Sequence, residues 1–234
     1  ALVDCLSLVK PFVLEGAALL PAYRRMVFAR RSVFGQDGTA GILAESPVLA
    51  PSPGISLDGV RLLRLLSFMG DAEVTLDFKD EKLLASVAGA RGSFSLAGVE
   101  DVPMPSWPKP SQLVPSPDGL LAAIRFAVFN ADASGRAGPL SSVCLDGRGA
   151  WVTDGARVTF VALKGSALKQ QVLVPASVVA MLPVGDEPVS WGVVEGVLWL
   201  VWGQQKIWSR LLEPPFPDVS PVFQRATALA NSTP

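Results

Sequence analysis

The chemistry open to this chain is limited first by one missing residue type, because none of its 234 residues is histidine. A serine or cysteine protease triad, an imidazole general base and a histidine-based zinc helix are therefore excluded. Asp71, Asp154 and Asp186 are the carboxylates that a β-rich hydrolase could use, although each adjoins a glycine at an expected turn. The adjacent Glu100 and Asp101 would point to opposite faces of a strand. No catalytic residue, metal ion or cofactor is predicted.

The cysteine pattern and the hydropathy bear on compartment. Cys5 and Cys144 lie far apart in the chain and form no C-x-x-C motif, which favours reduced thiols in a cytoplasmic protein. The most apolar stretch, 192–202, is interrupted by Glu195 and is shorter than the roughly 20 residues that cross a bilayer. We therefore expect no membrane partner.

Basic and acidic residues nearly cancel. The chain has 20 Lys and Arg against 21 Asp and Glu, which gives a net charge of −1. This balance excludes a strongly basic surface that would hold nucleic acid by charge alone. Arg61 and Arg64 form a local exception, because they lie three residues apart on the polar side of an expected helix. Taken alone, such a pair is typical of a solvated helix face.

The elements that must position these residues are mostly short strands. Half of the residues are hydrophobic, and runs of β-branched and aromatic residues end at Gly, Pro or Asp. The expected strands are 26–34, 41–45, 73–78, 82–87, 92–96, 140–145, 150–153, 158–163, 189–194, 197–202 and 206–212. Four segments with helical spacing interrupt them, namely 7–16, 58–69, 116–129 and 175–182, with Ser7 and Ser116 as expected caps.

The same order of elements occurs twice along the chain: a helix, strands, a second helix and three strands. Residues 56–105 align with 173–221 over much of their length, and a Gly-Asp pair follows the second helix in both copies. The pattern predicts an α+β fold built by duplication. Its expected parts are an N-terminal domain (1–105), a proline-rich linker (106–116), a C-terminal domain (117–223) and a mobile tail (224–234).

Four motifs in a fixed order carry a family resemblance. They are SLVKPF at 7–12, WVTDGARV at 151–158, VLVP at 172–175 and PFPDV at 215–219. Together they resemble the bacterial β sliding clamp of DNA polymerase III, and the likeness covers almost the whole chain. Two departures are Ala156, where the family usually has histidine, and the lack of a counterpart to the family's third domain. By itself, Asp154-Gly155 is an ordinary type I′ hairpin turn.

The resemblance implies a ring whose sheets form the outside and whose helices line a hole occupied by duplex DNA. A near-neutral chain suits that task, because each added phosphate contact would increase salt-dependent affinity and hinder sliding. Contacts to phosphate carry no sequence preference. On the first three helices and the loop after the first, the implied DNA-binding residues are Lys10, Arg24, Arg25, Arg61, Arg64 and Arg125.

The resemblance also implies protein partners. Because clamps of this kind contain six domains in the ring, two domains per chain imply a homotrimer closed head to tail. A replicative DNA polymerase and a clamp loader would insert apolar tails into a groove beside the Thr-Asp-Gly hairpin. The residues carried over to that groove are Leu140, Thr153, Gly155, Ala156, Arg157, Val158 and Pro175.

Three functions remain open at this point. The leading one is a non-enzymatic processivity factor for DNA replication, and its short length would suit a bacteriophage clamp. The second is a monomeric docking module that keeps the clamp fold but does not encircle DNA. The third is the carboxylate hydrolase considered above.

Overall fold

The fold is taken from a computed structural model of the chain. The described residues are 2–15, 20–47, 49, 52–70, 72–79, 82–87, 90–95, 105–131, 138–165, 168, 170–185 and 187–232. The chain divides into two compact units: unit 1 contains residues 1–107 and 203–208, and unit 2 contains residues 108–202 and 209–234.

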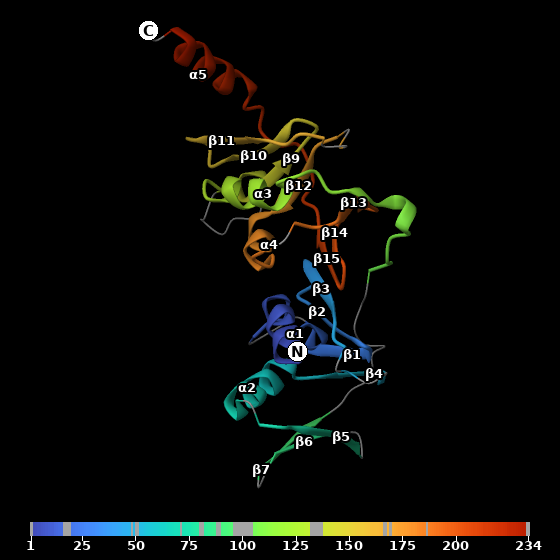
Figure 1. Ribbon diagram of the computed structural model, residues 1–234. Helices are drawn as coiled ribbons and strands as arrows, with labels where there is room; N and C mark the ends of the chain where they lie inside the picture. Colours follow the sequence, from blue (N-terminus) through green and yellow to red (C-terminus); the bar gives the residue numbers. More distant parts are fainter. Residues whose placement is uncertain are drawn as a thin grey trace. The chain divides into compact units, whose positions relative to one another are not determined.

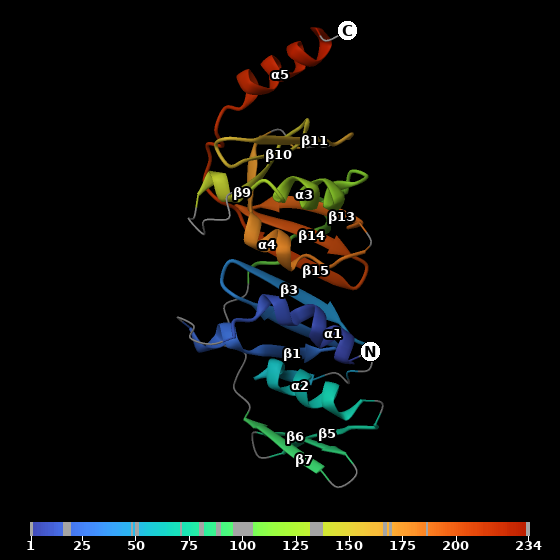
Figure 2. The same ribbon diagram turned by 90° about the vertical axis from the view of Figure 1, so that its left-hand side faces the viewer.

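Unit 1 combines two α-helices with two antiparallel sheets. One sheet has the strand order β4-β1-β2-β3, and the other has the order β5-β6-β7. Helix α1 contacts α2 and also packs on β2 and β3. In both Figure 1 and Figure 2, α2 lies between α1 and the β5–β7 sheet. The elements are α1 (Leu2–Val9), η1 (Lys10–Phe12), η2 (Pro21–Arg24), β1 (Met26–Arg30), β2 (Ser32–Gln36), β3 (Ala40–Glu45), β4 (Ser52–Leu57), α2 (Gly59–Met69), β5 (Thr75–Lys79), β6 (Lys82–Val87) and β7 (Ala90–Ser95).

Unit 2 repeats this arrangement. Its helices α3 and α4 contact each other, α3 packs on β9, β10 and β11, and one sheet has the order β11-β10-β9-β12. The elements are η3 (Pro110–Gln112), β8 (Val114–Pro115), α3 (Leu120–Val128), η4 (Pro139–Ser141), β9 (Ser142–Leu145), β10 (Gly149–Thr153), β11 (Val158–Ala162), β12 (Val172–Pro175), α4 (Ala176–Met181), β13 (Ser190–Val194), β14 (Val197–Trp202), β15 (Gln205–Arg210) and α5 (Ser220–Ser232).

The predicted duplication is confirmed by topology. Along the chain, the order of one α-helix, four strands, a second α-helix and three strands occurs twice, ending with β7 and with β15. Residues 205–208 of β15 fall in unit 1 and residues 209–210 in unit 2. In both four-stranded groups the first strand lies between the second and the fourth, as β1 does in unit 1 and β9 in unit 2. Unit 2 has an additional antiparallel strand, β8, in which Val114 pairs with Trp191 of β13. β8 lies inside the segment that was expected to be a linker.

The second helix of unit 1 was predicted almost to the residue. Asp58 caps α2, because its Oδ1 atom accepts a hydrogen bond of 2.9 Å from the backbone N–H of Arg61. Leu62, Leu63 and Leu66 are buried on one side of the helix. The helix ends at Gly70, whose φ of 60° places it in the left-handed region that glycine tolerates.

The first helix was placed wrongly. The expected helix over 7–16 with Ser7 as its cap is instead an α-helix over Leu2–Val9 followed by a single 3₁₀ turn, η1. Pro11 accounts for the difference, because a proline lacks the N–H that continues an α-helix and clashes with the preceding turn. It is tolerated near the start of η1, where that N–H is not needed.

Two strand predictions also differ from the structure. The single strand expected over 26–34 is a hairpin of β1 and β2, which reverses direction at Arg30 with a φ of 56°. Strand β4 was not expected, because its sequence contains Pro53 and Gly54, residues depleted in strands. β4 pairs with β1, so it completes the sheet on the side away from β3.

The first helix of unit 2 starts later than expected. Ser116 was the expected cap, but α3 begins at Leu120 after a turn in which the Leu120 N–H donates to the carbonyl of Pro117. The Glu187 carboxylate accepts hydrogen bonds from the N–H groups of Leu121 (2.7 Å) and Ala122 (3.1 Å). The free N–H groups at the start of α3 are therefore bound by a carboxylate about 65 residues away in the sequence. The local sequence does not indicate this role.

Removal of this cap has a measurable cost. We expect Glu187→Ala to lower the free energy of unfolding by about 1 kcal/mol, because two N–H groups of α3 lose their acceptor. Glu187→Gln keeps an acceptor and is expected to lose about half as much. Urea unfolding followed by circular dichroism measures both, with exposed Glu213→Ala as the control. Equal stability of the Glu187→Ala and Glu213→Ala variants would contradict this role.

The expected tail contains a helix. Pro221 stands in the first turn of α5, and the Asp218 carboxylate accepts a hydrogen bond from the Ser220 N–H at 3.0 Å just before it. Most of the segment expected to be a mobile tail, 224–234, therefore lies in α5. The first turn of α5 lies in the expected C-terminal domain, 117–223.

Each unit has a buried apolar core. Leu6, Met26 and Leu62 are fully buried in unit 1, as are Trp191 and Trp199 in unit 2. Both cysteines are buried, and burial raises the pKa of Cys5 to about 11 and that of Cys144 to about 12. Such thiols are poor nucleophiles at neutral pH. Among the described residues, no helix is long and apolar enough to cross a membrane.

Candidate functional site

Four of the six expected DNA-binding residues gather around one pocket in unit 1. The pocket has a volume of about 360 Å³ and lies where Leu14, Glu15 and η2 meet the start of α2. Its lining residues are Leu14, Glu15, Pro21, Arg24, Arg25, Asp58, Val60, Arg61 and Arg64. Four guanidinium groups and two carboxylates therefore share the surface of a small basic concavity.

The arginines of this pocket are held in different ways. Arg61 and Arg64 stand on the exposed side of α2, and the Arg61 guanidinium lies 5.7 Å from the centre of the Phe94 ring. Arg25 is fixed to β4, because its Nε donates to the Ser56 hydroxyl at 3.0 Å and a terminal nitrogen donates to the Ser56 carbonyl at 2.7 Å. Arg24 ends η2 with its side chain exposed.

Glu15 connects the pocket to a fifth cation. Its carboxylate lies 2.6 Å from a terminal nitrogen of Arg64 and 3.4 Å from the Nζ atom of Lys10. Lys10 does not line the pocket itself, but it reaches the same carboxylate. Sequence reasoning did not single out Glu15, because 49 residues separate it from Arg64 and no motif includes both.

The sixth expected contact, Arg125, lies in unit 2. One terminal nitrogen of its guanidinium donates to the carbonyl of Leu182 at 2.9 Å and to that of Pro183. This side chain therefore ties α3 to the segment that follows α4. The structure brings Arg24, Arg25, Arg61 and Arg64 together, and it gives Arg125 an internal hydrogen-bonding role.

The expected docking groove centres on the turn between β10 and β11. Thr153 pairs with Val158 across the hairpin, and its hydroxyl donates to the carbonyl of Arg157 at 2.7 Å while it accepts from the Gly155 N–H at 3.1 Å. Gly155 has a φ of 91°, which favours glycine there. The side chains of Ala156 and Arg157 are exposed at the tip, where a partner can reach them.

Asp154 serves this turn. Its Oδ1 atom accepts hydrogen bonds from the N–H groups of Ala156 (2.9 Å) and Arg157 (2.7 Å), and these bonds hold the pKa of the carboxyl below its usual value. Asp71 and Asp186, the other candidate carboxylates, lie outside the described residues. Within the described part of the chain, no cluster of three or more Cys, Asp or Glu side chains is placed to hold a metal ion.

The remaining expected groove residues, Leu140 and Pro175, lie next to the start of β9 in the same four-stranded sheet. Pro175 ends β12 and pairs with Ser142 of β9, and Leu140 lies two residues before Ser142 on η4. Leu140 was expected on a strand, but Pro139 starts a 3₁₀ turn there. Pro175 is buried and Leu140 is half-buried.

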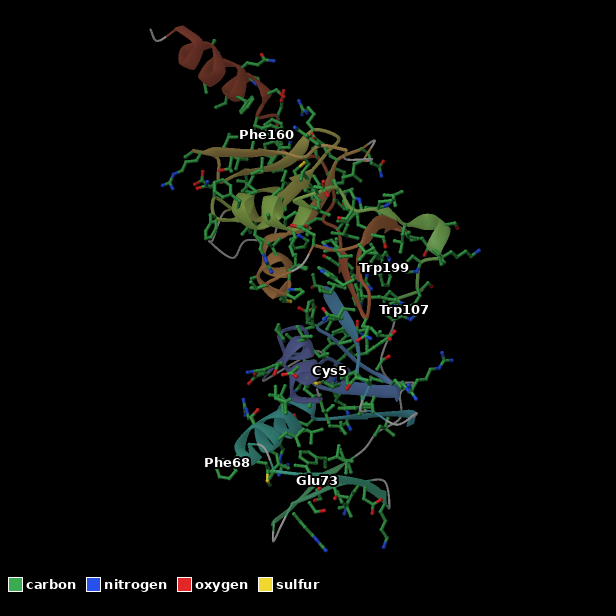
Figure 3. All side chains as sticks on the ribbon, viewed as in Figure 1. Cys5, Phe68, Glu73, Trp107, Phe160 and Trp199 are labelled. Atoms are coloured by element: carbon green, nitrogen blue, oxygen red, sulfur yellow. The ribbon has the colours of Figure 1, made fainter. Side chains whose placement is uncertain are left out.

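An aromatic cluster that sequence reasoning missed covers part of this sheet. Trp151 stacks on Phe160 with ring centres 4.0 Å apart, and Phe223 of α5 meets both rings edge-on at 5.4 and 5.5 Å. Figure 3 shows Phe160 at the foot of α5. Val158, an expected groove residue, packs with Phe160 against the buried core cluster that contains Trp151. Phe223, the last residue of the expected C-terminal domain, thus supplies a ring to the surface beside the hairpin.

Asp146 stabilises the turn that leads into β10. Its Oδ1 accepts from the N–H groups of Arg148 (2.8 Å) and Gly149 (3.1 Å), and its Oδ2 accepts from the Arg148 guanidinium at 2.9 Å. Burial opposes ionisation of this carboxyl, but the hydrogen bonds outweigh that effect and lower its pKa. A carboxyl whose pKa is lower in the folded state stabilises the fold above its unfolded pKa, and this contribution disappears as pH falls through the folded pKa.

We therefore expect Asp146→Asn to lower the free energy of unfolding by about 2 kcal/mol at pH 7, since hydrogen bonds to a charged group are lost. The difference from the wild type should shrink as the pH falls below about 4. Urea unfolding over a pH series measures this, with exposed Asp118→Asn as the control. A difference that is independent of pH would contradict the assignment.

Comparison with known proteins gives a clear result for the fold. No family model matches the sequence, and no curated protein matches it. The solved β sliding clamp of C. crescentus superposes with a TM-score of 0.81 at 21% identity, over 95% of this chain and 65% of that chain. The DNA polymerase sliding clamp of Bacillus subtilis gives 0.79 at 18% identity, over 94% and 65%. The beta subunit of the Streptococcus pyogenes DNA polymerase gives 0.78 at 16% identity, over 94% and 64%.

These matches identify the fold. The chain has the α+β fold of the bacterial DNA polymerase III β sliding clamps, which confirms the predicted fold class and the resemblance on which it was based. The chain spans about 65% of the length of these solved clamps. At identities of 16 to 21% the likeness concerns the fold, and the activity has to be argued from the site.

Proposed function

We propose that this chain is a DNA sliding clamp, a non-enzymatic processivity factor that encircles duplex DNA and tethers a replicative polymerase. The supporting observation is an arginine-lined pocket on a sliding-clamp fold: Arg24, Arg25, Arg61 and Arg64 gather at the helices of unit 1. Guanidinium groups bind backbone phosphates without reading bases, as a protein that moves along DNA requires. A clamp loader would place the ring on DNA in the cytoplasm.

The ring itself is part of the proposal. In the six-domain ring that the resemblance implies, three chains with two such units each would close a homotrimer by head-to-tail contacts. Edge strands at the two ends of the chain would pair across each boundary and so be protected from other partners. A native mass of three times 24.6 kDa is the expected result for the 234-residue chain, measured by native mass spectrometry.

We further propose that the hairpin between β10 and β11 docks the tails of the polymerase and the loader. Its exposed tip offers Gly155, Ala156 and Arg157, and the nearby Val158 and aromatic cluster supply apolar surface. An extended peptide would place apolar side chains on that surface while Arg157 contacts its backbone or an acidic group. Leu140, Thr153 and Pro175 would frame the groove from the same sheet group.

Topological retention tests encirclement without a loader. The protein is incubated with a linear duplex anchored to a bead at one end, the free end is then blocked with streptavidin, and the bead is washed at high salt. A ring that has threaded onto the DNA stays bound and is released when a restriction enzyme cuts the duplex. A protein held only by charge leaves in the wash. Loss in the wash from blocked DNA would refute encirclement.

One observation favours the docking module as a second candidate. Arg25 and Arg125 both donate hydrogen bonds to backbone carbonyls, and Lys10 and Arg64 share Glu15, which reduces the charge open to DNA. A monomeric native mass together with no retention on blocked DNA would establish that alternative over the ring.

A further inference from the structure

Glu15 is one of the two carboxylates that line the arginine pocket. Its two carboxylate oxygens divide between two cations, with Oε2 at 2.6 Å from Arg64 and Oε1 at 3.4 Å from Lys10. It lines the pocket together with Arg24, Arg25 and Arg61. A carboxylate and a phosphate present the same kind of acceptor to a guanidinium, so the two anions compete for Arg64.

The second carboxylate of the pocket has a different task. Asp58 accepts a hydrogen bond from the Arg61 N–H and caps α2, so its charge is directed at the helix N-terminus. Among the described residues, the partners of the Glu15 carboxylate are the side chains of Lys10 and Arg64. Glu15 is therefore the carboxylate of this pocket that pairs with side chains expected to contact DNA, those of Lys10 and Arg64.

The ion pairs of Glu15 are open to solvent. The Glu15 side chain is 46% exposed and the Arg64 side chain is 69% exposed. Exposed ion pairs contribute little to stability, so a passing phosphate can displace Glu15 from Arg64 at small cost. The same displacement returns Glu15 to water, where its carboxylate is well solvated. The arrangement fits a contact that exchanges rapidly.

We propose that Glu15 is an internal competitor for DNA backbone phosphates, which keeps the grip of this pocket on duplex DNA weak. This inference rests on the proposed clamp function. When Glu15 holds Lys10 and Arg64, those two cations recruit fewer phosphates, so fewer counterions are released on binding. Weak, rapidly exchanging contacts are what a ring that slides along DNA requires, since each lasting contact resists movement.

The test is Glu15→Gln, which removes the charge and keeps the size of the side chain. Binding to a short linear duplex is measured by fluorescence anisotropy over a series of salt concentrations. We expect the variant to bind about 10-fold more tightly at about 0.1 M salt. The slope of log binding constant against log salt concentration (the salt slope) should be steeper by about 1 to 2, because about 0.9 counterions are released per phosphate contacted. Diffusion of the variant along stretched DNA should also be slower.

Glu73→Gln is the matched control, since Glu73 is an exposed glutamate of unit 1 that lies outside the pocket lining. It removes the same charge without freeing Lys10 or Arg64. In an Arg64→Ala background, Glu15→Gln should increase the affinity for duplex less, because it then frees one cation, Lys10, and not two.

The outcomes separate the two proposals. If the Glu15→Gln and Glu73→Gln variants show the same affinity and slope while the wild type binds duplex, the competitor role of Glu15 is wrong and the clamp function stands. If the wild type and all variants fail to bind duplex at low salt and are not retained on blocked DNA, the clamp function itself is wrong. Persistence of the full effect in the Arg64→Ala background would also overturn the competitor role.

Discussion

Joint replacement of Arg24, Arg61 and Arg64 by alanine is expected to weaken binding to a short duplex on the order of 100-fold at about 0.1 M salt. All three guanidinium groups line the same pocket, and none of them packs in the core. The salt slope should decrease by about 2 to 3, since each lost phosphate contact removes about one counterion from the balance. The loss should be uniform across DNA sequences.

The matched control removes three cations from another surface of unit 1. Lys79, Lys82 and Arg91 are exposed on the β5–β7 sheet and lie outside the pocket. Their joint replacement by alanine changes the net charge equally, so a general electrostatic effect would weaken binding to the same degree. Equal losses for the two triple variants, measured by the same anisotropy titration, would show that the pocket is not the DNA contact.

Local signals explain which parts of the fold could be predicted. The helix α2 combines a capping aspartate, an apolar face with a 3.6-residue period and a terminal glycine, and all three lie within 13 residues. The hairpin of β13 and β14 is similarly marked by Glu195-Gly196 between two apolar runs. Where the sequence carries such signals, the expected and observed bounds agree to within about two residues.

Distant interactions explain the errors. The N–H groups at the start of α3 are bound by the carboxylate of Glu187, which follows α4 in the sequence. Because the local sequence does not show this distant cap, Ser116 was wrongly predicted as the cap. In the run 26–34, the turn at Arg30 goes with the pairing of β1 with β2, and the sequence there contains none of the residues Gly, Pro, Asn or Asp that usually mark a turn. Tertiary pairing overrides local pattern at such positions.

The candidate site divides in the same way. Arg61 and Arg64 could be identified from their helical spacing, but their proximity to Arg24 and Glu15 depends on tertiary packing, which brings η2 and Glu15 next to α2. The aromatic cluster offered one usable signal: Val219 and Phe223 are four residues apart, so they share a face of the helical turn. The partners of that face, Trp151 and Phe160, come from the pairing of β10 with β11.

That pairing depends on one small residue. Gly149 lies opposite Ala162 at the start of β10, and a Cβ atom built there would lie 2.1 Å from the carbonyl oxygen of Val161. The same atom would lie 2.8 Å from the Phe160 ring. Because the nearest obstacle is backbone, a side chain cannot relieve the clash by changing rotamer, and β11 itself must move.

We therefore expect Gly149→Ala to lower the free energy of unfolding by about 3 kcal/mol, as an overpacked contact that shifts the backbone does. Gly203→Ala is the control, because its Cβ would meet no atom within 4 Å, and its expected effect is within about 0.5 kcal/mol. Urea unfolding followed by circular dichroism measures both. Since β10 and β11 carry the Thr153–Val158 turn, a destabilised Gly149→Ala variant should also bind polymerase tail peptides more weakly, whereas equal stability of the two variants would show that β11 has room to move.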